Sequence, residues 1–573
     1  MKEKMKVVLT ALNSKFIHSN LAIRYLKAYT KDLNYECITR EFTINDRREK
    51  VLEQLIKEEA DVIVFSCYIW NIEFIQGLAK LINLVDSNIK MVYGGPEVSY
   101  DSISFLKENV GEYVIVGEGE ETYREFINWQ LECEKLDKNG FDDRILEKPK
   151  SIKGLSFKIG EKVYFNGDRD LMDLNKVIFP YNEQDNLQNK IVYYEASRGC
   201  PFNCKYCLSS TTHGVRFFET NRVKKELKFL VDKGAKLIKF VDRTFNCNVN
   251  FAMDIWKFLI ELDTEVTFHF EISADILTEE EIKLLSNAPK GRIQFEVGVQ
   301  TTNNEILKNI NRNVNFEDIK EKVEELESIK NIKQHLDLIA GLPGENIKSF
   351  KKSFNDVYSI RPEEIQLGFL KLLKGSPMRE EATKWGMVYS PYAPYEILKT
   401  KDISYDEIII LKRIEEVLDK YYNSRKFDNI LNYFLPKFKT SFDFYRSLGE
   451  FFYDKGYLNR NISSAEYYRV FIEFNQESLK ENSNKLKEII KYDYLKFNKK
   501  KWIPEFLVRE RNKEEERKIK EKIVDKKIKL SKNYHMEKFF VDIDKYINEN
   551  LLEEKQCYIL FDESDENRIQ INM

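Results

Sequence analysis

The stretch YYEASRGCPFNCKYCLSS, residues 193–210, brings three cysteines together: Cys200, Cys204 and Cys207. The whole chain of 573 residues has only eight cysteines, so this grouping needs a chemical reason. Three neighbouring thiols could form a disulfide and leave one over, bind zinc with a ligand missing, or hold an iron–sulfur cluster that keeps one iron open. A structural zinc site usually takes two pairs of ligands, and neither His213 nor Cys247 supplies the usual second pair. Three thiolates on one short loop therefore favour a [4Fe–4S] cluster held at three irons.

The composition is that of a globular protein in water, with 42% hydrophobic and 33% charged residues. Lys and Arg total 92 against 95 Asp and Glu, so the net charge of −3 gives no reason to expect nucleic acid as a partner. No apolar run approaches the roughly 18 residues of a membrane span, and the N-terminus is predicted to be a strand rather than a signal peptide. We therefore expect a cytoplasmic protein without membrane contact, in which clustered cysteines are metal ligands or catalytic thiols rather than structural disulfides.

Alternating strands and helices are predicted over residues 1–145. Amphipathic stretches separate four short apolar runs, at 6–12, 61–68, 90–96 and 112–120. This alternation is typical of βαβ units and predicts a Rossmann-like (flavodoxin-like) domain with a parallel sheet. Ligands of such sheets bind beyond the carboxyl ends of the strands. The paired glycines at these ends let the backbone approach a bulky ligand, or simply make tight turns.

A second set of strands is predicted over residues 185–388. Six apolar runs alternate there with helical stretches, at 191–197, 236–242, 265–272, 292–300, 334–342 and 364–373. Six strand–helix repeats predict a partial (β/α)6 barrel, whose functional groups lie at the carboxyl ends of the strands. The three cysteines follow the first of these strands, where such a site is expected.

Two further segments complete the chain. The linker, residues 146–184, is predicted to hold a small hairpin with its turn at Gly160. Residues 389–573 are predicted to be mostly α-helical, and we interpret their many aromatic side chains as core. Basic residues between 495 and 532 alternate with acidic ones, which is typical of a solvated helix face rather than an RNA-binding surface.

The cysteine motif CxxxCxxC, with the aromatic Tyr206 before its third cysteine, resembles that of the radical S-adenosylmethionine (SAM) superfamily. FVDRTFN, FEISAD, VGVQTTNNEIL and DLIAGLPGE resemble the same superfamily at the second to fifth barrel strands. LKLLKGSPM resembles the end of the sixth strand in cobalamin-associated members. SCYIWNIE, YGGPEVS and VGEGEETY resemble the cobalamin-binding domain that precedes many radical enzymes. The C-terminal region is similar to that of one uncharacterised subgroup of cobalamin-associated radical SAM proteins.

The resemblance implies a [4Fe–4S] cluster on Cys200, Cys204 and Cys207, with SAM on the open iron. Asp242, Arg243 and Thr244 replace the Gly-Gly-Glu often found after the second strand. A carboxylate there is chemically suited to the ammonium group of SAM, although a strand-end carboxylate can also cap the next turn. The implied SAM contacts are Tyr206, Asp242, Glu271, Ser273, Gln300, Thr301 and Ile339.

The resemblance also implies a cobalamin site at the strand ends of the first domain. Related domains that supply a lower axial ligand carry an Asp-x-His-x-x-Gly loop, which this sequence lacks, so we expect cobalamin without a protein ligand on its lower face. His18 lies in the corresponding loop, where it could approach the cobalt, cap the next helix or bond within the loop. The implied contacts are Ser66, Tyr68, Gly94, Gly95, Glu97, Gly117, Glu118 and Gly119.

The predicted function is that of a cobalamin-dependent radical SAM enzyme, which cleaves SAM reductively at the cluster and methylates an unactivated carbon. This chemistry implies an oxygen-sensitive enzyme that works under anaerobic conditions and receives electrons from a flavodoxin- or ferredoxin-like reductant. The substrate and further catalytic residues stay unknown. One alternative is a radical SAM enzyme that uses cobalamin without methylation, or not at all. Another is an RNA methylthiotransferase, which needs further cluster cysteines that the scattered Cys37, Cys67 and Cys133 do not convincingly supply. A non-enzymatic iron–sulfur or cobalamin-binding protein is a third.

Overall fold

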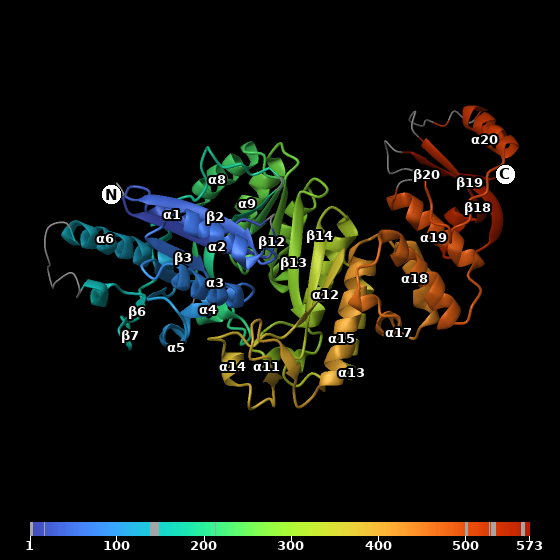
Figure 1. The fold of residues 1–573 in the computed structure, drawn as a ribbon. Coiled ribbons are helices and arrows are strands. Elements are labelled where there is room, and N and C mark those ends of the chain that lie inside the picture. Colours follow the sequence, from blue (N-terminus) through green and yellow to red (C-terminus); the bar gives the residue numbers. More distant parts are fainter. Residues whose placement is uncertain are drawn as a thin grey trace. The chain divides into compact units, whose positions relative to one another are not determined.

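The computed structural model describes residues 4–15, 18–137, 148–188, 190–212, 214–498, 502–525, 528, 534–562 and 568–572. The chain forms two compact units, one made of residues 1–346 and 369–403 and the other of residues 347–368 and 404–573. The predicted fold class is confirmed, because two α/β sheets precede a mostly helical C-terminal region in the chain (Figure 1). His213 lies outside the described residues. Within the described part, no helix is both long enough and apolar enough to cross a membrane.

The first sheet has seven strands in the order β2-β1-β3-β4-β5-β6-β7. The first five pair in parallel and follow the flavodoxin-like order, whereas β6 and β7 pair antiparallel. Its strands are β1 (Lys6–Asn13), β2 (Glu36–Thr43), β3 (Val62–Ser66), β4 (Lys90–Gly94), β5 (Tyr113–Ile115), β6 (Leu155–Ile159) and β7 (Lys162–Phe165). Its helices are α1 (Leu21–Tyr29), α2 (Arg48–Lys57), α3 (Ile72–Val85), α4 (Pro96–Ser99), α5 (Ser102–Glu108) and α6 (Gly119–Asp137).

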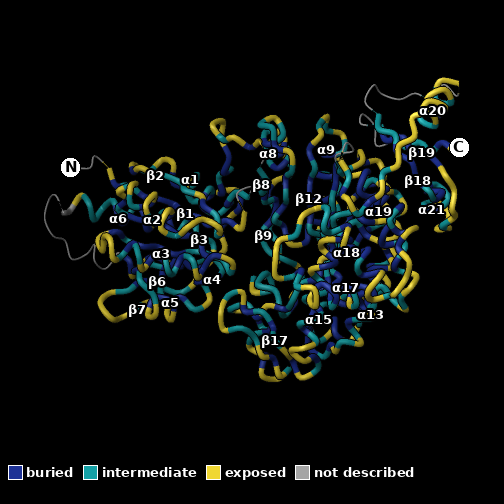
Figure 2. The backbone as a smooth tube through the Cα atoms, turned by 45° about the vertical axis from the view of Figure 1, so that its right-hand side comes forward, coloured by how far each residue is buried: buried dark blue, intermediate teal, exposed yellow. Residues whose placement is uncertain are grey.

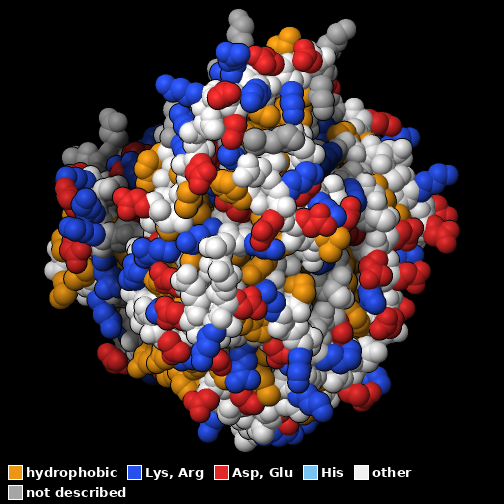
Figure 3. Space-filling view, turned by 90° about the vertical axis from the view of Figure 1, so that its right-hand side faces the viewer, with side chains coloured by type: hydrophobic (Ala, Val, Ile, Leu, Met, Phe, Trp, Pro, Cys, Tyr) orange, Lys and Arg blue, Asp and Glu red, His pale blue; other side chains and the backbone are white. Residues whose placement is uncertain are grey.

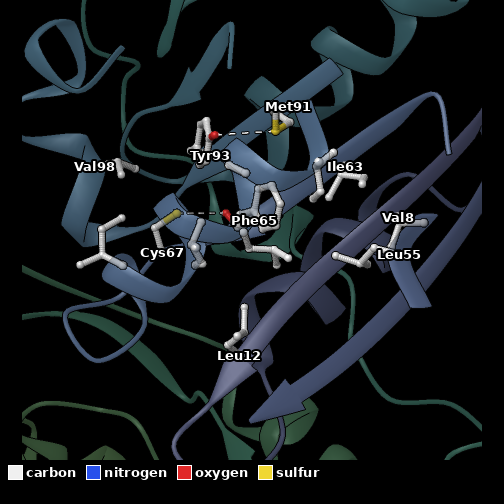
Figure 4. Packing of buried hydrophobic residues seen from close by; sticks show 14 of the residues in the cluster. Val8, Leu12, Leu55, Ile63, Phe65, Cys67, Met91, Tyr93 and Val98 are labelled. Carbon is white, nitrogen blue, oxygen red and sulfur yellow. Dashed lines mark hydrogen bonds between the residues drawn. The ribbon is translucent and has the colours of Figure 1, made fainter. Parts of the chain in front are cut away.

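Both faces of this sheet are buried, as a doubly wound sheet requires. Val8 packs on one face with Leu55 of α2, as Figure 4 shows from close by, and α3 covers the same face. Val7 faces the other side, where Tyr123 of α6 belongs to the second apolar cluster. Each fully buried aliphatic side chain contributes about 1.5–3 kcal/mol of stability. Because both faces of the sheet are covered in this way, a ligand can reach it only at the ends of the strands.

Two features of this sheet differ from the sequence-based expectation. β2 was not predicted, because its sequence ECITREFT, on a half-exposed edge strand, has neither a continuous apolar run nor a regular alternation of apolar and polar residues. The hairpin expected between the domains instead continues the sheet, since β6 pairs with β5. Its turn contains Gly160, which has a positive φ of 56°.

The second sheet has six strands in the order β15-β14-β13-β12-β11-β8, which is their order along the chain read backwards. This arrangement confirms the partial barrel. Its strands are β8 (Ile191–Tyr194), β11 (Leu237–Phe240), β12 (Thr267–Ile272), β13 (Ile293–Gln300), β14 (Lys333–Ala340) and β15 (Glu364–Phe369). The helices between them are α8 (Thr220–Asp232), α9 (Val249–Glu261), α10 (Glu279–Leu285), α11 (Asn304–Asn309), α12 (Phe316–Ile329) and α13 (Ile347–Ile360).

Alternate residues of the barrel strands differ in polarity. On β12, Phe268 and Phe270 belong to the apolar core, whereas His269 and Glu271 point to the other face. Lys239 on β11 lies directly opposite His269 and forms an ion pair of 3.0 Å with Glu296 on β13. The inner face of the barrel is therefore polar and charged, and its outer face packs against helices. Residues 369–403 add α14 (Pro377–Glu380) and the short strands β16 (Val388–Tyr389) and β17 (Ile397–Lys399).

The second unit is built on an aromatic core, as expected. Tyr421 packs edge-on against Phe427 and close to Phe471, with ring centroids 4.8 and 4.5 Å apart. On the molecular face in Figure 3, Lys and Arg side chains are intermixed with Asp and Glu. Exposed residues lie mostly at helix ends and in loops (Figure 2). The C-terminal end also forms an antiparallel sheet of β18 (Tyr534–Val541), β19 (Glu554–Asp562) and β20 (Arg568–Asn572). Its helices are α15 (Tyr405–Leu418), α16 (Asp428–Phe434), α17 (Ser441–Asp454), α18 (Ser464–Glu477), α19 (Asn484–Phe497), α20 (Lys513–Asp525) and α21 (Ile543–Glu549).

Candidate functional site

The three clustered cysteines lie on a loop between two short antiparallel strands, β9 (Ser197–Cys200) and β10 (Gly214–Phe217). This hairpin directly follows β8, so it stands at the carboxyl end of the first barrel strand. Gly199 holds the two strands close together: its φ is +106°, and a Cβ there would lie 2.1 Å from the Gly214 carbonyl oxygen. The loop therefore starts from a backbone position that only glycine fits.

The thiols of this loop lie close enough to influence one another. All eight cysteines of the chain are described and free. Burial raises the pKa of the Cys204 thiol, the neighbouring Cys207 and Cys200 raise it further, and the Arg312 guanidinium opposes this effect. Arg312 donates to Cys204 Sγ over 3.8 Å, the Ser209 backbone N–H donates to Cys207 Sγ over 3.4 Å, and the hydroxyl of Thr244 lies 3.6 Å from Cys200 Sγ.

This donor set fits an iron–sulfur cluster. In the described part of the chain, no three His, Cys, Asp or Glu side chains converge on a point that could hold one metal ion. A [4Fe–4S] cluster needs wider spacing, because each thiolate binds a separate iron. Hydrogen-bond donors around the sulfur atoms also suit thiolate ligands. The sequence did not point to Arg312, since a lone arginine in the loop after α11 carries no recognisable pattern.

Two of the predicted SAM contacts are carboxylates: Asp242, which is buried just after β11, and Glu271, which is half-buried on the neighbouring strand β12. Asp242 accepts a hydrogen bond of 3.0 Å from the Ala196 N–H and another from the Ser197 hydroxyl. Burial raises its pKa to about 7. Burial also raises the pKa of Glu271, which lies 3.8 Å from Arg243. The Asp242 carboxylate thus ties the end of β11 to the start of β9, while Glu271 faces the barrel interior.

The remaining predicted SAM contacts lie at or near strand ends. Gln300 ends β13 with a φ of +70°, and its buried Oε1 atom has no hydrogen-bond partner, so it is an acceptor suited to a ligand donor. Thr301 donates to Glu345 over 2.7 Å. Ser273 donates from its backbone N–H to Asn246 Oδ1 over 3.0 Å. Tyr206 in the cysteine loop and Ile339 on β14 are both half-buried.

A cavity of about 1510 Å³ opens at the carboxyl ends of the first sheet. Single ligand pockets usually measure about 300–1,000 Å³, so this cavity has room for a bulky cofactor. Beside Gly117, a Cβ would meet nothing within 4 Å, which leaves the backbone open to a ligand. All the predicted cobalamin contacts except one line the cavity: Ser66, Tyr68, Gly94, Gly95, Gly117, Glu118 and Gly119.

The exception is Glu97, whose carboxylate is buried and used within the protein. It accepts a short hydrogen bond from the Tyr395 hydroxyl and lies 3.3 Å from Lys374 Nζ. Sequence reasoning placed it at the cofactor because it follows the glycine pair. Trp70, which was not predicted, also lines the cavity and stacks on Tyr68 with ring centroids 4.4 Å apart.

The opposite wall of the cavity comes from the barrel mouth. Tyr193, Arg198 and Arg243 line it, so the ligand edge of the sheet faces the carboxyl ends of the barrel strands. His18 lies in the same cavity, with Nδ1 2.7 Å from the Tyr193 hydroxyl, and burial lowers its pKa. In this structure, the His18 side chain is therefore hydrogen-bonded to another residue of the protein, Tyr193. None of the seven predicted SAM contacts lines this cavity; on the barrel side it is reached by neighbours such as Arg243, the residue after Asp242.

Comparisons with known proteins agree with this arrangement. Residues 7–127 match the B12 binding domain, residues 194–357 the radical SAM superfamily, and residues 383–561 a protein of unknown function, DUF4080. The cobalamin-dependent radical SAM methyltransferase TokK of Streptomyces tokunonensis is 24% identical over 365 residues, which make up 59% of this chain and 51% of TokK. The chain spans about half the length of several curated relatives that it matches.

Two solved structures share the fold. OxsB, a cobalamin-dependent S-adenosylmethionine radical enzyme with aqua-cobalamin and S-adenosylmethionine bound, is 14% identical with a TM-score of 0.57, over 92% of this chain and 82% of OxsB. TsrM from Kitasatospora setae, a radical S-adenosylmethionine methyltransferase with cobalamin and a [4Fe–4S] cluster, is 15% identical with a TM-score of 0.54, over 68% of this chain and 82% of TsrM. The barrel strands and the cysteine loop thus fall within a radical SAM domain. More particularly, the chain carries a B12 binding domain, a radical SAM domain and a DUF4080 region in that order.

Proposed function

We propose that this chain is a cobalamin-dependent radical SAM enzyme that methylates an unactivated carbon. The observation that carries the proposal is the single cavity of about 1510 Å³ lined both by the glycine-rich strand ends of the B12 binding domain and by the barrel mouth. When bound, the cluster supplies the electron that cleaves SAM, and cobalamin supplies the methyl group. A shared cavity would hold one substrate between the two cofactors and exclude water from a reactive radical.

The chain's own residues divide into three sets in this proposal. Cys200, Cys204 and Cys207 hold the cluster at three irons, and Arg312 compensates part of the thiolate charge. Gln300, with its unpaired buried acceptor, and Glu271 are the foremost SAM contacts. The backbone at Gly94, Gly95 and Gly117 approaches the cobalamin, and His18 stays on Tyr193 rather than on the cobalt. The other predicted SAM contacts complete the proposed site, as do the other predicted cobalamin contacts apart from Glu97.

The alternatives have less support. An RNA methylthiotransferase needs further cluster ligands in its N-terminal domain. Cys67 is buried in the apolar cluster on one face of the first sheet, whereas Cys37 and Cys133 pack against the cluster on the other face. Three thiols on opposite sides of a sheet cannot share one cluster. A flavodoxin- or ferredoxin-like reductant and a cytoplasmic location belong to the proposal, because the cluster needs low-potential electrons and reduced thiols.

Anaerobic purification followed by cofactor analysis tests the proposal. We expect four irons, four sulfides and one cobalamin per chain, together with 5′-deoxyadenosine or methylated product when SAM and a reductant are added. Cys204→Ala is expected to abolish cluster absorption, whereas Cys247→Ala, a matched cysteine that lies outside the motif, is expected to keep it. Absence of cobalamin would sink the cobalamin-dependent reading, and cobalamin without any methylated product would favour its non-methylating alternative.

A further inference from the structure

Five charged side chains join the turn after β5 to the hairpin that carries the cysteines. Arg198 on β9 and Arg216 on β10 lie directly opposite each other across the antiparallel pair. Two like charges in that position repel unless carboxylates neutralise them. The carboxylates come from Glu118 and Glu120, at the start of α6, and from Glu195, which follows β8.

Arg198 is the centre of this charged network. Its Nη2 donates to Glu120 over 2.5 Å, its Nε donates to Glu195 over 3.0 Å, and its Nη1 lies 3.6 Å from Glu118. Its guanidinium also covers the Tyr25 ring, 5.4 Å from the ring centroid. The Arg198 side chain is only 12% exposed and that of Glu120 only 6% exposed, so solvent screens these charges little.

Arg216 completes the network from the opposite strand. It forms a short ion pair with Glu118 and donates to the Met172 carbonyl over 2.7 Å. Glu118 in turn accepts from the Met172 N–H over 3.0 Å. The carboxylate of Glu118 is therefore held by the cysteine hairpin, while its backbone stands between Gly117 and Gly119 at the cavity wall.

The network connects the two cofactor loops over a very short path. Arg198 precedes Cys200 by two residues, and Gly199 between them is paired with Val215 in the β9–β10 hairpin and packs closely on Gly214. At the other end, Gly117 and Gly119 line the cavity on either side of Glu118. A displacement of the Gly117–Gly119 turn by a bound cofactor would therefore move charges that lie on the strand of the first cysteine.

We propose that Arg198 is a positioning residue that couples occupancy of the cobalamin edge to the geometry of the cysteine loop. The inference rests on the proposed function, since it takes cobalamin and the cluster as the two ligands. Coupling between two binding sites is reciprocal, so a loaded cluster strengthens cobalamin binding by the same factor as cobalamin strengthens cluster binding. Couplings of this kind are typically about 5- to 150-fold, and for one network we expect roughly tenfold.

Anaerobic titration with hydroxocobalamin tests this coupling, in the full-length protein with and without its reconstituted cluster. In the native protein, we expect the dissociation constant to fall about tenfold when the cluster is present. Arg198→Met keeps the aliphatic stem without the charge. It is expected to bring the ratio of the dissociation constants without and with the cluster close to one. Arg198→Lys, which can pair with one carboxylate only, is expected to restore part of it. A merely structural role would weaken both affinities and leave their ratio unchanged.

The matched control is Arg124→Met. Arg124 lies on α6, the helix that carries Glu120, and forms a two-pronged ion pair with Asp32 at 2.6 Å. This ion pair does not belong to the network. Arg124→Met should keep the native ratio. If Arg198→Met does not fold, Glu120→Gln decides instead, because it removes a network charge at constant size. The inference is overturned if Arg198→Met or Glu120→Gln keeps the native ratio of the two hydroxocobalamin dissociation constants. It is also overturned if that ratio is one in the native protein. Failure of the native protein to bind hydroxocobalamin at all would refute the proposed function rather than the coupling.

Discussion

Gly95→Ala tests whether the close backbone approach at the cofactor edge is required. Gly95 has a φ of +117° and a ψ of 172°, a region that is essentially restricted to glycine. Strain there costs about 1–3 kcal/mol for another residue. A Cβ would also lie 2.4 Å from the Cys67 carbonyl oxygen, and forcing apart such packed atoms adds about 1–3 kcal/mol. The variant should therefore lose about 2–6 kcal/mol from the free energy of unfolding.

The lost free energy should be accompanied by lost cobalamin binding. The Cys67 N–H donates to the Gly94 carbonyl over 2.7 Å, so moving Cys67 away from Gly95 disturbs the ends of β3 and β4, where the cavity begins. Urea denaturation followed by circular dichroism measures stability, and hydroxocobalamin titration measures binding. The control is Gly160→Ala, where φ is also positive, at +56°, but a Cβ meets nothing within 4 Å. It should cost only about 1–2 kcal/mol. Equal losses in the two variants, or unchanged cobalamin affinity in Gly95→Ala, would refute the reasoning.

Three further predictions follow from single contacts. Arg312→Met should slow alkylation of Cys204 by iodoacetamide several-fold in cluster-free protein at pH 8, because the guanidinium lowers a thiol pKa that burial raises; mass spectrometry measures the rate, and an unchanged rate would contradict it. Asp242→Asn should flatten the pH dependence of stability. The pKa of Asp242 is about 7 in the folded state against an ordinary 3.8, so the folded state binds the proton more tightly. In the native protein, about 4 kcal/mol of stability is therefore lost as the pH rises from about 4 to about 7. Urea midpoints at pH 5 and pH 8 measure this loss, and an unchanged pH dependence in the variant would count against it. Tyr395→Phe should cost about 1–3 kcal/mol, because it removes a donor from the buried Glu97 carboxylate; thermal unfolding that matches the native protein would exclude that role.

Much of the candidate site could be predicted because its chemistry is local in the sequence. Cys200, Cys204 and Cys207 occupy one loop, and the apolar run before them places that loop at a strand end. The glycines that line the cavity likewise lie at or just after the ends of their strands, as Gly94, Gly95 and Gly117 do. The strand that was missed, β2, is a half-exposed edge whose apolar residues are interrupted by charged ones. The hairpin β9–β10 was missed because its strands, SRGC and GVRF, contain no apolar run.

The sequence by itself determined the order of those strands and helices that have clear apolar runs, the place of the cysteine loop after β8, and the glycine-rich strand ends of the first sheet. Those features depend on spacing and on hydrophobic periodicity, which short segments contain in full. Only the tertiary structure decided which side chains meet. Glu97 is 298 residues from Tyr395, and Arg198 is 78 residues from Glu120. Such partners are selected by the packing of whole domains, in which a buried charge must find a counter-charge wherever the fold supplies one, and no local pattern records that choice.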